Sequence, residues 1–89
     1  RKKINKMSKL ELSVLGTTIN AAYVFTILGE KVKFFVDENV SDLSTKFLGK
    51  NVLHPSQLKD EDITILPYQN NYEIKSRFET LYSGLFILL

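Results

Sequence analysis

The chain has 89 residues, of which 44% are hydrophobic and ten are aromatic, so the sequence predicts one small folded domain and excludes a disordered chain. Its formal net charge is +2, but five of the twelve basic residues lie in the first nine positions, and the remainder carries seven basic against ten acidic residues. A basic leader on a mildly acidic domain argues against a nucleic-acid-binding face, and the lack of cysteine with a single histidine argues against disulfides and a structural zinc site.

The longest apolar runs, AAYVF and LFILL, are five residues long, far below the roughly 18 that a membrane span requires. The basic start is not followed by an apolar run, so no signal peptide is predicted. We therefore expect a cytoplasmic protein without a membrane span. Because the chain opens on Arg1, we expect a fragment: residues 1–9 are a leader or the end of a preceding segment, and residues 10–89 are a domain of a larger protein.

The first predicted element is a buried strand over Leu10–Leu15, an apolar run that ends at Gly16. A helix over Ile19–Leu28 follows, and the hydroxyl of Thr17 or Thr18 is expected to cap its first turn.

This helix is apolar on nearly its whole circumference, and Gly29 is expected to end it as a left-handed cap. A helix of this kind needs cover on both sides. We expect another domain or a second copy of the chain to contact it around Ala22, Tyr23 and Thr26.

The second strand is predicted over Val32–Val36, with Asp37 at its carboxyl end and a polar loop after it. Gly49 predicts a turn into a short extended piece over residues 51–53. Pro55 then suits the first turn of a short helix, which His54 would begin.

The third strand is predicted over Ile63–Leu66. The last helix is predicted over Asn71–Tyr82, opened by a capping box between Asn70 and Glu73, and residues 85–89 form the final strand. Strands that alternate with helices favour a parallel sheet with right-handed crossovers. The sequence therefore predicts a small three-layer, Rossmann-like α/β domain with about four parallel strands in the order 2-1-3-4, or alternatively 3-2-1-4.

The turn after the first strand partly matches the dinucleotide-binding fingerprint G-x-G-x-x-G/A. Gly16 and Ala21 occupy the first and third positions, and Asp37 follows Gly16 by 21 residues, close to the roughly 20 expected for an acidic residue on a ribose hydroxyl. Thr18 replaces the second glycine, and its branched side chain would crowd a diphosphate. The turn therefore has two interpretations, a nucleotide or phosphate contact and a purely structural strand–helix–strand unit.

Ligand contacts in open α/β sheets lie beyond the carboxyl ends of the strands. The third strand is followed there by a proline and a tyrosine. The candidate binding residues predicted from the sequence are Gly16, Thr17, Thr18, Asp37, Pro67 and Tyr68.

The pattern FFVDEN…FLGKNVLHPSQL…ITILPY resembles small Rossmann-like domains of bacterial sugar-modifying enzymes. The closest are the C-terminal domain of sugar C-methyltransferases and the N-terminal domain of hexapeptide-repeat sugar acetyltransferases. Both carry a strand ending in Phe/Val-Asp, a polar loop, and then Gly-x-x-Val-x-x-Pro-x-x-Leu. The matching residues are Phe35, Val36, Asp37, Gly49, Val52, Pro55 and Leu58.

The resemblance implies a nucleotide-sugar-binding or accessory domain of a sugar-modifying transferase, with Gly16, Asp37 and Pro55 as the residues carried over. A nucleotide sugar is then the expected ligand, and no metal is expected. The alternative is a non-catalytic scaffold or assembly domain. No nucleophile–base pair stands at a diagnostic spacing, so we do not expect catalysis by the domain alone.

Overall fold

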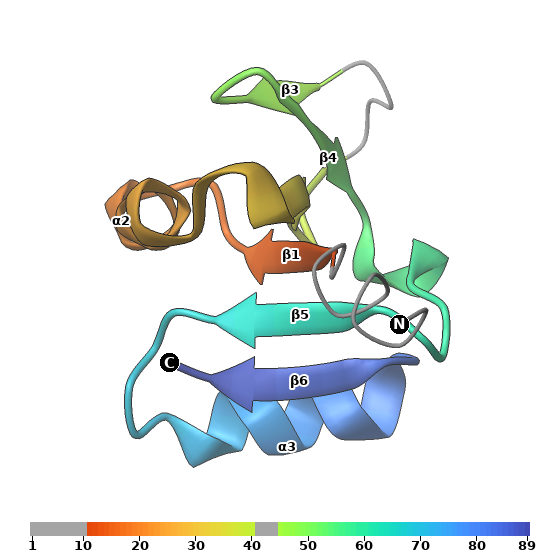
Figure 1. Cartoon of the computed structure of the whole chain (residues 1–89). Coiled ribbons are helices and arrows are strands. Elements are labelled where there is room, and N and C mark those ends of the chain that lie inside the picture. The colour runs from red at the N-terminus through yellow and green to blue at the C-terminus, as the bar shows by residue number, and fades with distance from the viewer. Residues whose placement is uncertain (1–10, 41–44) are drawn as a thin grey trace, which may run out of the picture.

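The computed structural model describes residues 11–40 and 45–89 and forms an α/β domain (Figure 1). The predicted leader, residues 1–9, lies outside this range. The elements follow one another as β1 (Leu12–Leu15), α2 (Ile19–Leu28), η1 (Gly29–Lys31), β2 (Val32–Val36), β3 (Lys46–Phe47), β4 (Lys50–Leu53), η2 (Pro55–Gln57), β5 (Ile63–Leu66), α3 (Tyr72–Leu81) and β6 (Leu85–Leu88).

The strands of the described residues form one six-stranded sheet in the order β3-β4-β2-β1-β5-β6. All neighbouring pairs are parallel except β3 and β4, which are antiparallel. The α/β class is therefore as predicted, but the described residues form six strands instead of the predicted four, so neither 2-1-3-4 nor 3-2-1-4 is the order of the whole sheet. Within it, the four predicted strands are neighbours as β2-β1-β5-β6, which corresponds to the order 2-1-3-4. The difference arises at the β2 edge, where β4 and β3 extend the sheet.

The added edge is a hairpin whose turn consists of Leu48 and Gly49. Both residues have positive φ, +52° and +80°, as a tight two-residue hairpin turn requires. Phe47, next to the turn, places its ring edge against Phe35 with 4.9 Å between the ring centroids. This contact covers the β2 side of the core. No local sequence pattern indicates strand β3, because leucine rarely adopts a left-handed conformation.

Helix α2 covers one face of the sheet. Its buried residues Ala21 and Val24 pack with Val14, Phe35 and Ile65, which point to that face from β1, β2 and β5. The helix has the bounds predicted from the sequence. Gly29 ends it with φ +57° and ψ −126°, which is not the left-handed helical conformation expected.

Helix α3 covers the opposite face, where Phe78 is fully buried against Leu15, Leu66 and Phe86. The predicted capping box is wrong by one residue. Asn71 is the cap, and its side chain accepts a hydrogen bond from the backbone N–H of Ile74 at 3.2 Å. Asn70 instead takes a positive φ of +66° in the preceding turn.

Two polar side chains are buried in the centre of the sheet on this second face. Ser13 of β1 and Thr64 of β5 are register partners, and their hydroxyls lie 2.8 Å apart in a hydrogen bond. Each hydroxyl is therefore satisfied by the neighbouring strand.

The two crossovers, β1-α2-β2 and β5-α3-β6, lie on opposite faces of the sheet (Figure 1). The connections from β1 and β5 therefore leave in different directions at the carboxyl ends of these neighbouring strands. Such a switch point is where open α/β sheets place a ligand crevice. Among the described residues, no helix is long and apolar enough to cross a membrane.

Candidate functional site

The turn after β1 brings the chain into α2 at the switch point. Gly16 has φ +101°, and its N–H donates to the carbonyl of Val36 at 2.7 Å, which fixes the turn beside the end of β2. Thr18 is the residue before the first helical turn, but its side chain makes no capping hydrogen bond, so the predicted hydroxyl cap is wrong. The first turn of α2 also contains no acidic residue, so its exposed N–H groups remain open to an anion from outside.

Asp37 lies beside this turn, at the carboxyl end of β2. One carboxylate oxygen accepts a hydrogen bond from the hydroxyl of Thr17 at 3.1 Å, and the other accepts from the backbone N–H of Asn39 at 2.8 Å. A carboxylate has about four acceptor positions, so two of them remain for a ligand. The structure thus brings Gly16, Thr17 and Asp37 together across 20 residues of sequence.

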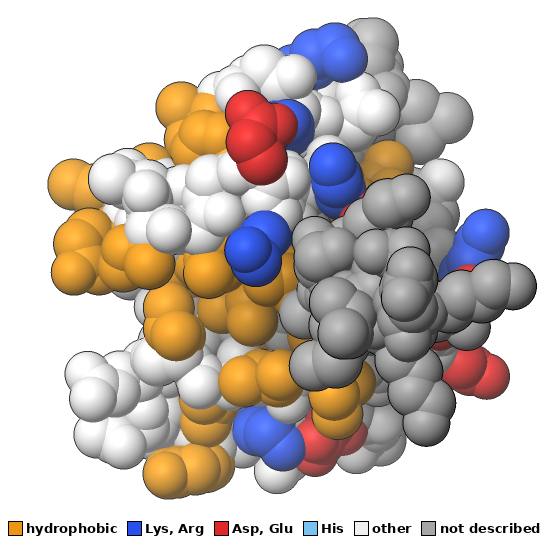
Figure 2. Space-filling model, in the orientation of Figure 1, with side chains coloured by type: hydrophobic (Ala, Val, Ile, Leu, Met, Phe, Trp, Pro, Cys, Tyr) orange, Lys and Arg blue, Asp and Glu red, His pale blue; other side chains and the backbone are white. Residues whose placement is uncertain are grey.

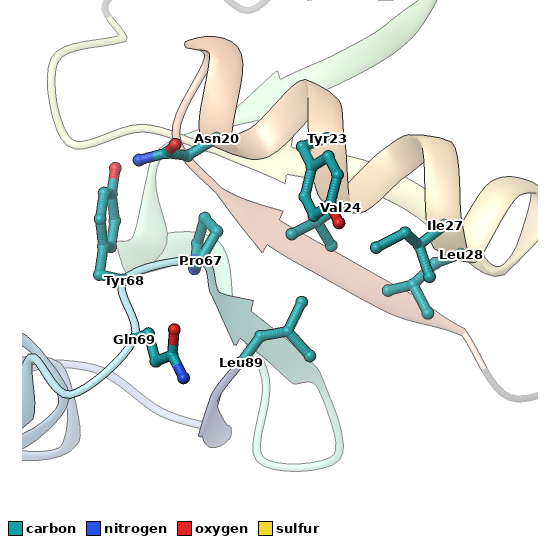
Figure 3. Close-up of a pocket in the computed structure, with 9 residues that line it drawn as sticks. All are labelled: Asn20, Tyr23, Val24, Ile27, Leu28, Pro67, Tyr68, Gln69 and Leu89. Carbon is teal, nitrogen blue, oxygen red and sulfur yellow. The ribbon is translucent and has the colours of Figure 1, made fainter.

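Tyr68 approaches the turn from the end of β5. A Cβ atom added at Gly16 would lie 3.1 Å from the Tyr68 hydroxyl, so the ring occupies part of the space above the turn. Pro67, which precedes it, lines a neighbouring groove on the α2 side (Figure 3). Both residues predicted after the third strand therefore border the switch point.

Three hollows meet around these residues. The smallest, of about 260 Å³, is lined by the Gly16–Thr18 turn, Asp37, Tyr68 and Arg77, among others. A second, of about 370 Å³, continues past Thr17 and Asp37 toward β3. The third is the groove of about 540 Å³ that runs from Tyr68 along α2 (Figure 3). Ligand pockets span roughly 300–1,000 Å³, so this edge of the sheet offers space on that scale.

A charged cluster that no sequence pattern predicts borders the smallest of these hollows. Arg77 of α3 donates two hydrogen bonds to the Glu38 carboxylate, at 2.7 and 2.9 Å, and the Tyr82 hydroxyl donates a third at 2.7 Å. The bonds from Arg77 lower the pKa of Glu38, the bond from Tyr82 acts in the same direction, and partial burial opposes them. The same hydrogen bond to Glu38 raises the pKa of Tyr82. The cluster holds the loop after β2, and with it Asp37, against α3.

His54 begins η2, as predicted. Its Nδ1 accepts a hydrogen bond from the backbone N–H of Ser56 at 3.1 Å, and its ring meets the edge of Tyr82 at 6.1 Å between centroids. Pro55, which is buried, occupies the first position of the short helix. Within residues 11–40 and 45–89, no three histidine or acidic side chains are grouped as a metal site would require.

No protein-family model matches the chain, and neither the curated proteins nor the solved structures contain a match. The likeness to domains of sugar-modifying enzymes therefore stays a prediction from the sequence motif alone.

Proposed function

We propose that this domain binds the nucleotide portion of a nucleotide sugar, or of another nucleotide, at the carboxyl ends of β1, β2 and β5. The observation that carries the proposal is the meeting of Asp37 with the Gly16 turn and the uncapped start of α2 at the switch point. Asp37 supplies acceptors for ribose hydroxyls, and the helix N–H groups supply donors for a phosphate. The two chemistries lie side by side, as a nucleotide requires.

Thr17 orients the carboxylate in this arrangement. Its hydroxyl donates to one Asp37 oxygen, while the Asn39 amide donates to the other, so the carboxylate is fixed before a ligand arrives. A fixed acceptor loses less conformational entropy on binding than a free one. Thr18, in the second glycine position of the fingerprint, limits how closely a diphosphate approaches, so we propose one phosphate contact at the helix start rather than a diphosphate lying on the turn.

The sequence resemblance suggests the setting. We propose that the domain is an accessory, nucleotide-sugar-binding part of a sugar-modifying transferase in polysaccharide biosynthesis, and that it does not catalyse a reaction by itself. Turnover of a nucleotide sugar by this chain, abolished by His54→Ala, would contradict that part of the proposal.

Calorimetric titration tests the binding. The 89-residue chain is titrated with UDP- and dTDP-sugars, and with S-adenosylmethionine and NAD as alternative ligands. We expect a nucleotide sugar to bind and Asp37→Ala to weaken it by more than about tenfold, or 1.4 kcal/mol. Asp60→Ala is the matched control, because it removes the same charge from an exposed turn that precedes the amino end of β5. Equal weakening by both substitutions would indicate a nonspecific charge effect and reject the site.

The second candidate function is a scaffold that uses the fold only for assembly. It is favoured by Tyr68, whose hydroxyl lies above Gly16 where a ligand would otherwise approach the backbone. If no ligand binds the original chain or Tyr68→Ala, while the chain dimerises with concentration, the scaffold function stands. Binding that appears only in Tyr68→Ala would show a site that the tyrosine closes.

A further inference from the structure

One face of the sheet is only partly covered by its helix. Along β6, Phe86 points toward α3 and is 1% exposed, whereas Leu85 and Ile87 point to the α2 side and are 53% and 40% exposed. Helix α2 lies over β1 and its neighbours and does not reach β6. Figure 2 shows the resulting band of hydrophobic side chains, which runs from α2 across the strands below it. The described part of the chain thus leaves an apolar strip beside α2.

Helix α2 itself presents an apolar ridge next to this strip. Ile19, Tyr23 and Ile27 are 82%, 67% and 58% exposed, and the helix sequence INAAYVFTIL contains no charged residue. Isolated exposed apolar side chains are common on proteins, but a contiguous apolar patch of this extent marks an interaction surface.

A groove of about 540 Å³ separates the ridge from the end of the sheet (Figure 3). Tyr23, Ile27 and Leu28 form its α2 wall, and Pro67 and Leu89 form the opposite wall. Among the described residues that line it, none is charged. The groove therefore offers no charged side chain to an ionic partner, and most of its lining suits aromatic and aliphatic side chains.

We propose that this face binds a second copy of the chain, with the α2 ridge of each copy seated in the groove of the other. A two-fold axis requires one surface that complements itself. Here the ridge and the groove are adjacent, the ridge is apolar and the groove is lined mainly by apolar residues, and neither brings a charged side chain that a second copy would leave unpaired. A rotation about an axis between them places Tyr23 and Ile27 of one copy against the groove and the Leu85–Ile87 strip of its partner.

The exposed area agrees with a dimer of modest stability. The six exposed apolar side chains of the face offer on the order of 600 Å² per copy, against about 800 Å² per partner in a standard interface. They are Ile19, Tyr23, Ile27, Leu85, Ile87 and Leu89. Edge-to-edge pairing of β6 would leave most of the α2 ridge uncovered, so we favour face-to-face packing.

Sedimentation velocity over a range of concentrations tests the dimer. We expect reversible dimerisation of the original chain, and Ile27→Glu should weaken it by roughly 100-fold, the effect of losing a central interface residue. Leu81→Glu is the matched control, because Leu81 is 57% exposed on α3 at the opposite face and should leave the dimer unchanged. Circular dichroism confirms that each variant is folded. A folded chain that stays monomeric at millimolar concentration, or a dimer that both substitutions weaken equally, would overturn the proposal.

Disulfide trapping distinguishes the two packing modes, because the chain contains no cysteine of its own. Ile27→Cys and Ile87→Cys variants are mixed and oxidised under mild conditions. Face-to-face packing predicts that the mixed 27–87 dimer exceeds both homodimers. A predominance of the 87–87 homodimer would show pairing of β6 edges, and the absence of any enrichment of the mixed product would likewise reject the ridge-in-groove arrangement.

Discussion

The two main helices have the same length but are adapted to their surroundings in different ways. Helix α3 buries Phe78, turns Glu73, Lys75 and Glu79 to solvent, and has a side-chain cap at its first turn. Helix α2 has no charged residue, no side-chain cap and three large apolar residues in solvent. Helix α3 exposes Tyr72 and Leu81 but carries charged side chains around them, as a surface helix does, whereas α2 has the composition of a helix that is covered on both sides.

The difference separates stability from interaction. Helix α3 is anchored by its buried ring, its cap and the cluster around Glu38, all of which act within the domain. Helix α2 contributes Ala21 and Val24 to the core, packs Phe25 and Leu28 against it, and exposes the apolar ridge of Ile19, Tyr23 and Ile27. Substitutions on α3 should therefore change the free energy of unfolding, and substitutions on the exposed face of α2 should change association.

The largest expected effect is from Phe78→Ala. Its ring is fully buried against Phe86 and Tyr82, so its removal should lower the free energy of unfolding by about 3–5 kcal/mol, a large share of the stability of a domain this small. Tyr23→Ala removes an aromatic ring from the exposed ridge and should cost less than about 1 kcal/mol in dilute solution. Urea unfolding followed by circular dichroism measures both. If Phe78→Ala and Tyr23→Ala lowered the free energy of unfolding by similar amounts, α2 would be as deeply anchored as α3.

The caps of the two helices should differ by a smaller amount. Asn71→Ala removes the hydrogen bond to the N–H of Ile74 and should lower the free energy of unfolding by about 1 kcal/mol. Thr18→Ala, at the corresponding position of α2, removes a side chain that makes no such bond. It should change the free energy of unfolding by a few tenths of a kcal/mol at most. The same urea titrations measure both changes. A larger loss of unfolding free energy from Thr18→Ala than from Asn71→Ala would contradict this difference between the two caps.

The smallest expected effect is the pH dependence contributed by Glu38. Its pKa is lowered in the folded protein from 4.5, so its stabilising effect is fully present above that value and is lost as the pH falls through the lower folded pKa. The urea midpoints of the original chain and of Glu38→Gln should therefore differ at pH 7 and draw together as the pH falls below 4.5 and through the lower folded pKa. Because the Glu38 and Arg77 side chains are 30% and 48% exposed, the difference should also shrink in 1 M salt.

Glu79→Gln is the control for that experiment. It breaks only the contact with Lys75 one turn away on α3 and should shift the free energy of unfolding by a few tenths of a kcal/mol. A gap between the urea midpoints of Glu38→Gln and the original chain that does not narrow at all as the pH falls below 4.5 would show that the cluster acts through packing rather than charge.

Local sequence patterns were sufficient for the elements that are bounded by glycine or cap residues. The helix Ile19–Leu28 lies between Gly16 and Gly29, and both its limits were predicted. The cap of α3 was misplaced because two asparagines are adjacent, and the choice between them depends on the left-handed φ of Asn70 in the preceding turn. Sequence pattern alone does not resolve such a choice.

Contacts between distant segments were not predictable in this way. Strand β3 depends on Leu48 in a left-handed turn and on the packing of Phe47 against Phe35, so it is not predicted as a strand. The charged cluster joins Glu38 to Arg77 and Tyr82, 39 and 44 residues away. In contrast, the position of Asp37 beside the Gly16 turn is predicted by its spacing after Gly16, because a strand–helix–strand unit has a nearly constant length.

The buried hydroxyl pair of Ser13 and Thr64 bears on how the chain reaches this fold. Residues 12–36 and 63–88 each close a strand–helix–strand unit over a short loop. The strands of the two units are joined where β1 pairs with β5, and the two hydroxyl residues at this pairing are 51 residues apart. Long-range parallel pairing is slow, because chain entropy is lost before the contacts form. If the register of the β1–β5 pairing were shifted by two residues, two unpaired hydroxyls would be buried, at a cost of about 1–3 kcal/mol each. The Ser13–Thr64 pair therefore selects the correct register at the step where the two halves of the domain assemble.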